Sequence, residues 1–222
     1  MASQGAGGPK DEATAALYYK KSLQTWKKEA DDGDAKAALW AALVYERKLV
    51  PDSSPEKSVP YLLQAAESGN LTAQGLLAFK YRDGLGVPQD AAKAVEWFEK
   101  AASRKDLGAV MELGIMFRDG KYLPPDREKA FHWFEKGAEW KDPYSMAALA
   151  DMLLEGTPSA EQAARALALY REAAAIGYFP AALKAAELLQ NGKGGELDAD
   201  EACRLLRRVA DAAGDPKAMY ML

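Results

Sequence analysis

The sequence predicts an all-α protein in which helical hairpins stack one on another as a solenoid. A Trp-Phe pair at residues 97–98 recurs at residues 133–134, and 133 minus 97 gives a period of about 36 residues. Small-residue pairs and single glycines follow the same spacing: Ala65-Ala66, Ala101-Ala102, Gly137-Ala138 and Ala173-Ala174, with Gly84, Gly120, Gly156 and Gly192. A unit of this length cannot bury its apolar face alone, so neighbouring units must pack together.

The composition is that of a folded protein and excludes several classes of partner. The chain has 222 residues, of which 49% are hydrophobic and 28% charged. Its 29 Lys and Arg against 33 Asp and Glu give a net charge of -4, so the basic footprint that nucleic acid requires is missing. The single cysteine, Cys203, excludes an intramolecular disulfide. No run approaches the ~20 apolar residues of a membrane span, so we expect no direct membrane insertion.

The N-terminal residues indicate the cellular compartment in which we expect the protein. Residues 1–10 are rich in glycine and contain no apolar stretch resembling a signal peptide, so we expect a flexible N-terminal tail and a cytoplasmic protein. A periplasmic location is the alternative if an export signal has been removed.

The first elements are a leading helix and a weak hairpin. Residues 11–34 contain a helix over 13–30 that caps the solenoid, which then extends over 35–222. The first unit, 35–70, is expected to hold helices over 35–47 and 55–68. Pro60 falls in the second of these helices, so that helix should start late or kink.

The two central units carry the clearest pattern. In unit 71–106, Ala73, Leu77 and Tyr81 form one helical stripe, and a glycine-rich turn with a proline ends that helix at about residue 83. Asp90 is placed to cap a second helix over 91–104. Unit 107–142 repeats this order, with its second helix starting at Asp126.

The remaining units follow the same period. Unit 143–178 should hold helices over 143–154 and 160–175, and unit 179–215 should hold helices over 179–189 and about 200–210. Residues 216–222 begin a partial unit. For its apolar tail, from Ala218 to Leu222, we expect either that it packs back as a cap or that the natural chain continues. Self-association through this tail is a further possibility.

Read as one pattern, the central repeat resembles the Sel-one-like repeat, a relative of the tetratricopeptide repeat. The pattern is Ala73-x3-Leu77-Ala78-x2-Tyr81-x2-Gly84-x-Gly86-Val87-x2-Asp90-x2-Lys93-Ala94-x2-Trp97-Phe98-x-Lys100-Ala101-Ala102. The resemblance covers most of residues 35–210. It implies a right-handed α-solenoid of about five hairpins with partial end units, whose first helices line a concave surface that binds other proteins, often in bacteria.

By analogy with tetratricopeptide geometry, first-helix residues off the packing stripe face the concavity. These residues predict a groove that is apolar and basic in its first half and acidic in its second: Leu39, Leu43, Phe79, Arg82, Met111, Ile115 and Arg118, then Asp151, Glu155 and Glu187. Contiguous exposed apolar residues tend to mark binding sites. Local pairing of Arg82 and Arg118 with Asp83 and Asp119 is the competing interpretation of those two arginines.

The sequence gives little evidence for catalytic residues. Ser54 and Lys57 match the S-x-x-K string of serine β-lactamases, but no S-D-N or K-T-G string accompanies it. Cys203 and His132 lie two units apart, on the order of 20 Å, which is too far for a nucleophile and its base. Their repeat positions predict that Cys203 is buried and His132 solvated, and one histidine with one distant cysteine cannot hold a metal.

The sequence therefore predicts a non-catalytic scaffold that binds a protein or peptide segment in its concave groove, without cofactor or metal. The repeated aromatics, Trp133 among them, are interpreted as buried core. Two alternatives stay open. One is a β-lactam or cell-wall hydrolase, as suggested for some cysteine-rich members of the family, whose regular cysteine pairs this chain lacks. The other is a structural protein that self-associates.

Overall fold

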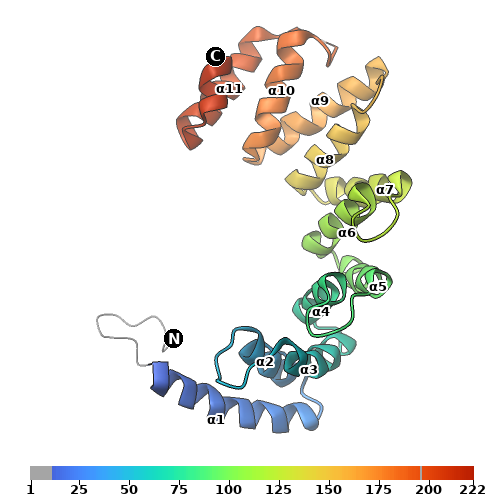
Figure 1. Cartoon of the computed structure of the whole chain (residues 1–222). Helices are drawn as coiled ribbons and strands as arrows, with labels where there is room; N and C mark the ends of the chain where they lie inside the picture. The colour runs from blue at the N-terminus through green and yellow to red at the C-terminus, as the bar shows by residue number, and fades with distance from the viewer. Residues whose placement is uncertain (1–11, 196) are drawn as a thin grey trace. The chain divides into compact units, whose positions relative to one another are not determined.

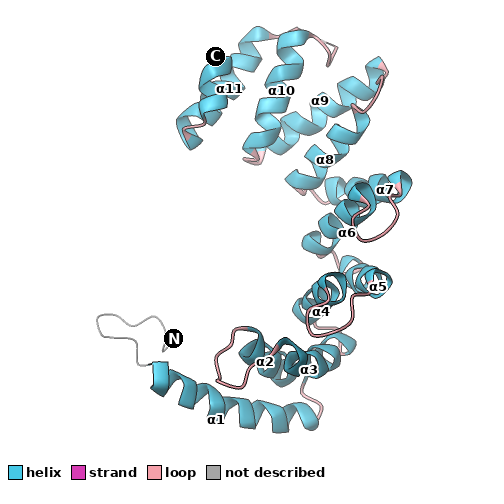
Figure 2. Cartoon of the chain, in the orientation of Figure 1, coloured by secondary structure: helices cyan, strands magenta, loops and turns pink. Residues whose placement is uncertain are grey.

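The computed structural model describes residues 12–195 and 197–222, and this part of the chain forms twelve helices and no strand (Figures 1 and 2). The prediction of an all-α fold of stacked hairpins is confirmed. The helices are α1 (Glu12–Asp31), α2 (Ala35–Glu46), α3 (Pro55–Glu67), α4 (Leu71–Asp83), α5 (Ala91–Ala102), α6 (Leu107–Asp119), α7 (Arg127–Glu139), α8 (Pro143–Leu153), α9 (Ala160–Ala175), α10 (Phe179–Asn191), α11 (Ala199–Ala213) and α12 (Pro216–Met221).

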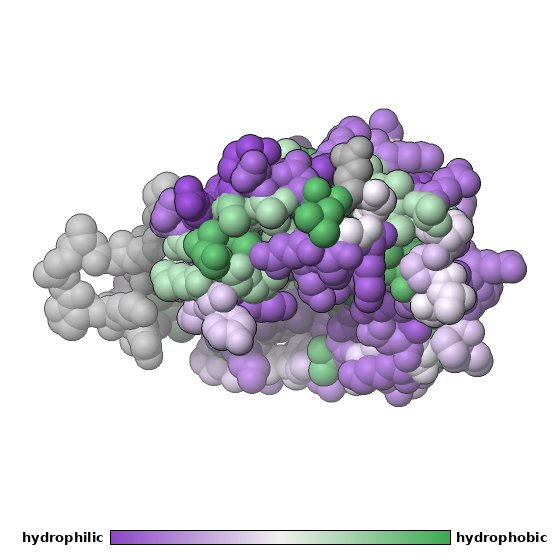
Figure 3. All heavy atoms as spheres, turned by 90° about the horizontal axis from the view of Figure 1, so that it is seen from above, coloured by the Kyte–Doolittle hydropathy of each residue, from purple (hydrophilic) through white to green (hydrophobic). Residues whose placement is uncertain are grey.

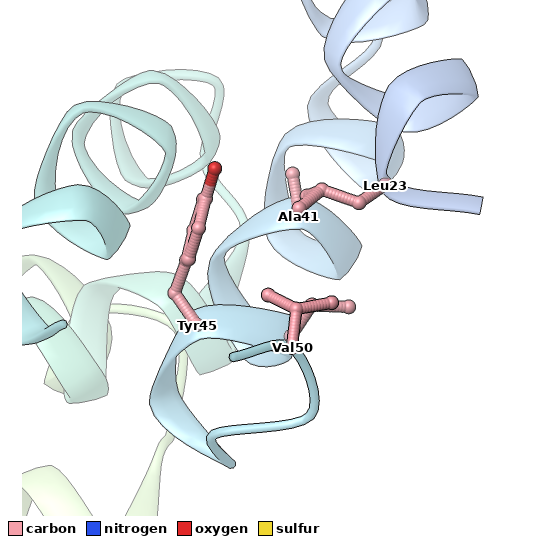
Figure 4. Packing of buried hydrophobic residues seen from close by; sticks show 5 residues of the cluster. Leu23, Ala41, Tyr45 and Val50 are labelled. Carbon is pink, nitrogen blue, oxygen red and sulfur yellow. The ribbon is translucent and has the colours of Figure 1, made fainter. Parts of the chain in front are cut away.

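The chain forms two compact halves, Met1–Ala109 and Val110–Leu222. In the N-terminal half, each of the helices α1 to α5 packs against the next. Its first core cluster joins Leu23 of α1 to Ala41, Val44 and Tyr45 of α2 and to Val50 of the following turn (Figure 4). The leading helix therefore covers the apolar side of the first hairpin.

The C-terminal half repeats this arrangement from α7 to α12, where each helix again packs against the next. Its second helices each place one large side chain in the core, and these side chains are at most 1% exposed: Phe134, Tyr170 and Leu206. A small residue of a first helix, Gly114, lies against Phe134. A methyl group at Gly114 of α6 would come within 2.4 Å of the Phe134 ring. The alternation of small and large residues therefore sets how closely the helices approach.

Capping residues lie at the helix ends that the sequence predicts. Asp90 accepts a hydrogen bond from the backbone N–H of Lys93 at 3.0 Å, and Asp126 accepts one from Lys129 at 3.0 Å. These bonds stabilise the ionised carboxylates and lower the pKa of both aspartates. Gly84 closes α4 in the left-handed conformation, at φ 71°, as a helix-ending glycine does.

One helix start differs from the prediction. Helix α3 begins at Pro55 and runs through Pro60, so the expected late start is wrong. Pro55 occupies the first helical position, where its fixed φ favours the helix and a missing N–H has no intrahelical partner to lose. Ser54 precedes it in an extended conformation.

Two predicted burials also need correction. Trp97 is 7% exposed, but Trp133 is only half-buried, and Lys136 lies 4.8 Å from the centre of its indole. Cys203 is half-buried as well. Phe131 and Val95, two and three periods earlier, are half-buried too, whereas Leu167, one period earlier, is buried, so this repeat position lies in the core in one unit and at its edge in the others. His132 is exposed, as predicted.

Two helical glycines give a matched test of this packing. No neighbouring atom lies within 4 Å of a methyl group at Gly75, whereas one at Gly114 would clash with the fully buried Phe134 ring. We expect Gly75→Ala to raise the free energy of unfolding by about 0.5–1 kcal/mol, because alanine favours the helix. Gly114→Ala should lower it by about 1–3 kcal/mol through overpacking. Denaturant titration measures both, and equal stability of the two variants would contradict the close approach of α6 and α7.

Candidate functional site

In the N-terminal half, the predicted residue Arg82 lies against its own helix. Its Nε and Nη2 donate to the two carboxylate oxygens of Asp83 at 2.9 and 2.8 Å. The guanidinium lies 4.7 Å from the centre of the Phe79 ring, and the side chain is 18% exposed. The local pairing considered for this arginine is therefore present, and Arg82 and Phe79 form one packed group.

The apolar candidates of this half are half-buried. Phe79 contacts Phe98 of α5 edge-on, with ring centres 5.1 Å apart. Leu39 and Leu43 of α2 are also half-buried. Beside Leu39, Trp40 is 51% exposed and stacks on Trp26 of α1 at 5.9 Å. An exposed aromatic therefore accompanies the predicted leucines, although it is not among the residues predicted for the groove.

In the C-terminal half, Arg118 repeats the arrangement of Arg82. Its Nε donates to Asp119 at 2.6 Å, and its guanidinium lies 5.7 Å from the centre of the Phe134 ring. The hydrogen bond to Asp119 raises the pKa of Arg118, and Tyr144 of α8 contributes to the same shift. Met111 and Ile115 of the same helix are half-buried. Arg118 of α6 therefore interacts electrostatically with Tyr144 of α8 as well as with Asp119.

The predicted acidic residues are largely neutralised within the chain. Asp151 accepts from Lys184 of α10 at 2.6 Å and from the buried hydroxyl of Tyr170. Glu155 pairs with Arg127 at 3.2 Å. Glu187 is exposed, and its charge adds to burial and to the Asp151 hydrogen bond in raising the pKa of Tyr170. The structure therefore shows neighbouring ion pairs where the sequence predicts an acidic stretch.

Two tyrosines that connect these groups are not among the residues predicted for the groove. Tyr144 at the start of α8 and Tyr178 before α10 are half-buried, with ring centres 6.4 Å apart. Burial raises the pKa of Tyr178, and the nearby Tyr144 and Asp151 raise it further. We call Arg118, Tyr144, Asp151, Tyr178 and Lys184 the tyrosine cluster. Its signal in the sequence was a pair of aromatics near one period apart at first-helix starts, outside the positions considered for the groove.

The candidate catalytic groups are engaged elsewhere. The Lys57 ammonium pairs with Asp52 and donates to the Asp52 carbonyl at 3.0 Å, and a hydrogen bond from Ser54 lowers the pKa of Glu56. Within residues 12–195 and 197–222, no group of three or more His, Cys, Asp or Glu side chains is placed to hold a metal. None of the described helices is long and apolar enough to cross a membrane.

Comparison with known proteins shows to which protein family the chain belongs. The Sel1 repeat pattern matches residues 1–24, 36–70, 72–106, 108–139, 143–178 and 180–213, so the chain belongs to the Sel1 repeat family. Proteins of this family are typically protein-interaction scaffolds. No curated protein was found to match the sequence.

Solved structures show the same fold. A Sel1 repeat protein from Oxalobacter formigenes superposes with a TM-score of 0.70 at 23% identity, over 91% of this chain and 82% of that one. A protective antigen of uropathogenic Escherichia coli strains, with the same repeat fold, gives a TM-score of 0.55 at 21% identity, over 90% of this chain. This chain spans 53% of that antigen. At these identities the likeness concerns the fold alone.

Proposed function

We propose that this chain is a non-catalytic scaffold that holds a segment of a partner protein on the exposed faces of its first helices. The observation that carries the proposal is the tyrosine cluster, which gathers side chains from three successive first-helix regions in the C-terminal half. Half-exposed tyrosines offer a large apolar area with a hydroxyl at one end, which is why tyrosine is enriched where proteins bind each other.

The ion pairs of the cluster fit this role. Lys184 and Asp151 are 51% and 47% exposed, and a pair this exposed contributes about 0–1 kcal/mol to stability. A charged group of a partner can therefore replace either member at a small cost. Arg118 with Asp119 is similarly exposed, at 33% and 46%. Such charges mainly orient a partner, while the tyrosine rings supply the buried anchors.

The N-terminal half contributes apolar contact in this proposal. Leu39, Leu43, Phe79 and Arg82 lie on α2 and α4, in the helices that correspond to those bearing the tyrosine cluster. In the C-terminal half the predicted Met111, Ile115, Glu155 and Glu187 remain candidates beside the cluster. We place the first contacts of a partner on the tyrosines, because their rings are the largest of these side chains.

A peptide library tests the proposal. We expect peptides selected from a displayed random library on the whole chain to lose about 2 kcal/mol of binding free energy, or about thirtyfold in Kd, when Tyr144 and Tyr178 are both changed to alanine. The matched control changes Arg204 and Arg207, two exposed residues of α11, to alanine. Circular dichroism must show all variants folded. If the α11 control loses binding and the tyrosine variant does not, the partner binds on second helices and the proposal is wrong.

A further inference from the structure

The two members of the ion pair in the tyrosine cluster are not held equally. The Asp151 carboxylate accepts from Lys184 at 2.6 Å and also from the hydroxyl of Tyr170, a side chain that is only 1% exposed. Lys184 is 51% exposed, and among the described residues it forms a hydrogen bond or ion pair with Asp151 alone. The carboxylate is therefore fixed in place, whereas the ammonium group that neutralises it can move away.

One oxygen of the Asp151 carboxylate is left for a further donor. Tyr170 and Lys184 both donate to Oδ1, and no residue in the described part of the chain donates to Oδ2. The Asp151 side chain is 47% exposed, so a partner can reach it. A carboxylate oxygen only accepts hydrogen bonds, and the bond is strongest when the donor is a cation.

The charges around Tyr178 are negative on balance. Burial raises the pKa of Tyr178, and the charges of Asp151 and Asp142 raise it further, whereas Lys184 has a smaller, opposite effect. The rings of Tyr178 and Tyr144 meet at 72°, and the faces of aromatic rings carry partial negative charge. Ring faces beside carboxylates favour a cation.

An anionic group of a partner fits this surface less well. The Nε of Arg118 donates to Asp119 at 2.6 Å, so the positive charge of Arg118 is already neutralised. An anion bound to Lys184 would lie beside the fixed Asp151 carboxylate and be repelled by it. Hydrophilic side chains surround small hydrophobic areas over the α10–α11 end of the chain, so polar groups there are open to a partner (Figure 3).

We propose that the tyrosine cluster binds a lysine or arginine side chain of the partner segment. The ammonium or guanidinium group donates to Oδ2 of Asp151 and lies against the rings of Tyr144 and Tyr178. Lys184 competes for the same carboxylate and so weakens the binding of the partner. The net charge of -4 favours a basic partner in the same way. This proposal rests on the proposed function, because it names the chemistry of the segment that the first helices hold.

The test begins with two random peptide pools selected on the whole chain. One pool lacks Lys and Arg, and the other lacks Asp and Glu. Peptides from both pools are sorted by whether their binding is lost when Tyr144 and Tyr178 are both changed to alanine. We expect the peptides that depend on the tyrosines to come from the pool that contains Lys and Arg.

Two variants with opposite effects then identify the charge that is bound. We expect Lys184→Ala to lower the Kd of a tyrosine-dependent peptide about threefold, because the competing cation is removed. Asp151→Asn should raise the Kd at least about tenfold, while its amide oxygen still accepts from Tyr170. Lys193→Ala, at an exposed lysine after α10, is the matched control and should change the Kd less than Lys184→Ala. Circular dichroism must show the three variants folded.

The direction of the Lys184→Ala effect decides between the two charges. Weaker binding of tyrosine-dependent peptides, or such peptides only from the pool without Lys and Arg, would show that the cluster binds an anion. A Kd that neither Lys184→Ala nor Asp151→Asn alters would show that it binds no charged group. In these cases the basic partner is wrong and the proposed function stands. If no peptide from either pool depends on Tyr144 and Tyr178, the proposed function fails as well.

Discussion

Replacing Lys80 with alanine is expected to lower the free energy of unfolding of the N-terminal half by about 3 kcal/mol, the lower end of the range for breaking a buried ion pair. Lys80 is 3% exposed, and its Nζ lies 2.7 Å from Glu46 Oε1. It also donates to the carbonyls of Leu85 and Pro55, at 3.2 and 3.5 Å. Its removal takes this donor from the Glu46 carboxylate and the Leu85 carbonyl, whereas the Pro55 carbonyl still accepts from the Ser58 hydroxyl at 2.6 Å. The Glu46 side chain is 26% exposed, so water recovers part of the loss.

A double variant separates charge from packing at this position. In later first helices the same repeat position holds Met116 and Met152, both 2% exposed, so methionine has the right shape. Lys80→Met combined with Glu46→Gln removes both charges, and we expect it to recover most of the stability lost by Lys80→Ala. Denaturant titration of the three chains measures this. A loss below about 1 kcal/mol for Lys80→Ala would show that the pair is a weak surface contact.

Replacing Gly86 with alanine is expected to cost about 2–5 kcal/mol. Gly86 has φ +80°, which disfavours any residue with a side chain by about 1–2 kcal/mol. The new methyl group would also lie 2.6 Å from the carbonyl carbon of Pro55 and 2.8 Å from the backbone nitrogen of Glu56. Backbone atoms cannot turn away as a side chain can, so the turn must separate from the start of α3.

Gly156→Ala is the matched control for this effect. Gly156 closes the equivalent turn of a later hairpin at φ +73°, but no neighbouring atom lies within 4 Å of the added methyl group. The free energy of unfolding of this variant should therefore fall by only about 1–2 kcal/mol, the cost of a side chain at positive φ. Thermal or denaturant unfolding of both variants gives the difference. An equal fall in the free energy of unfolding for both variants would mean that the turn containing Gly86 does not lie against the start of α3.

The helices could be predicted from the sequence because the same pattern of residues occurs in several repeat units. The Trp-Phe pairs, the turn glycines and caps such as Asp90 recur on one period, so an error in one unit is visible against the others. The sequence did not show why glycine is required at position 86. Its φ follows from the turn, but its approach to Pro55 depends on how consecutive hairpins pack, which no local pattern contains.

The candidate site was less predictable because its electrostatics depends on pairs from different repeats. Asp151 pairs with Lys184 across 33 positions of sequence, and Glu155 pairs with Arg127 across 28. Treating residues one by one predicted an acidic stretch, whereas the structure contains neutral pairs. Tyr144 and Tyr178 were not predicted because they lie at the starts of first helices, whereas the predicted groove positions lie further along each helix.

Photo-cross-linking shows directly whether partners bind on the first helices. A library-selected peptide carrying a benzophenone side chain would be irradiated with the whole chain, and the adducts mapped by mass spectrometry. We expect adducts on α8 and α10, at or beside Tyr144 and Tyr178, that disappear in excess unlabelled peptide. Competed adducts confined to the outer faces of α9 and α11 would contradict it.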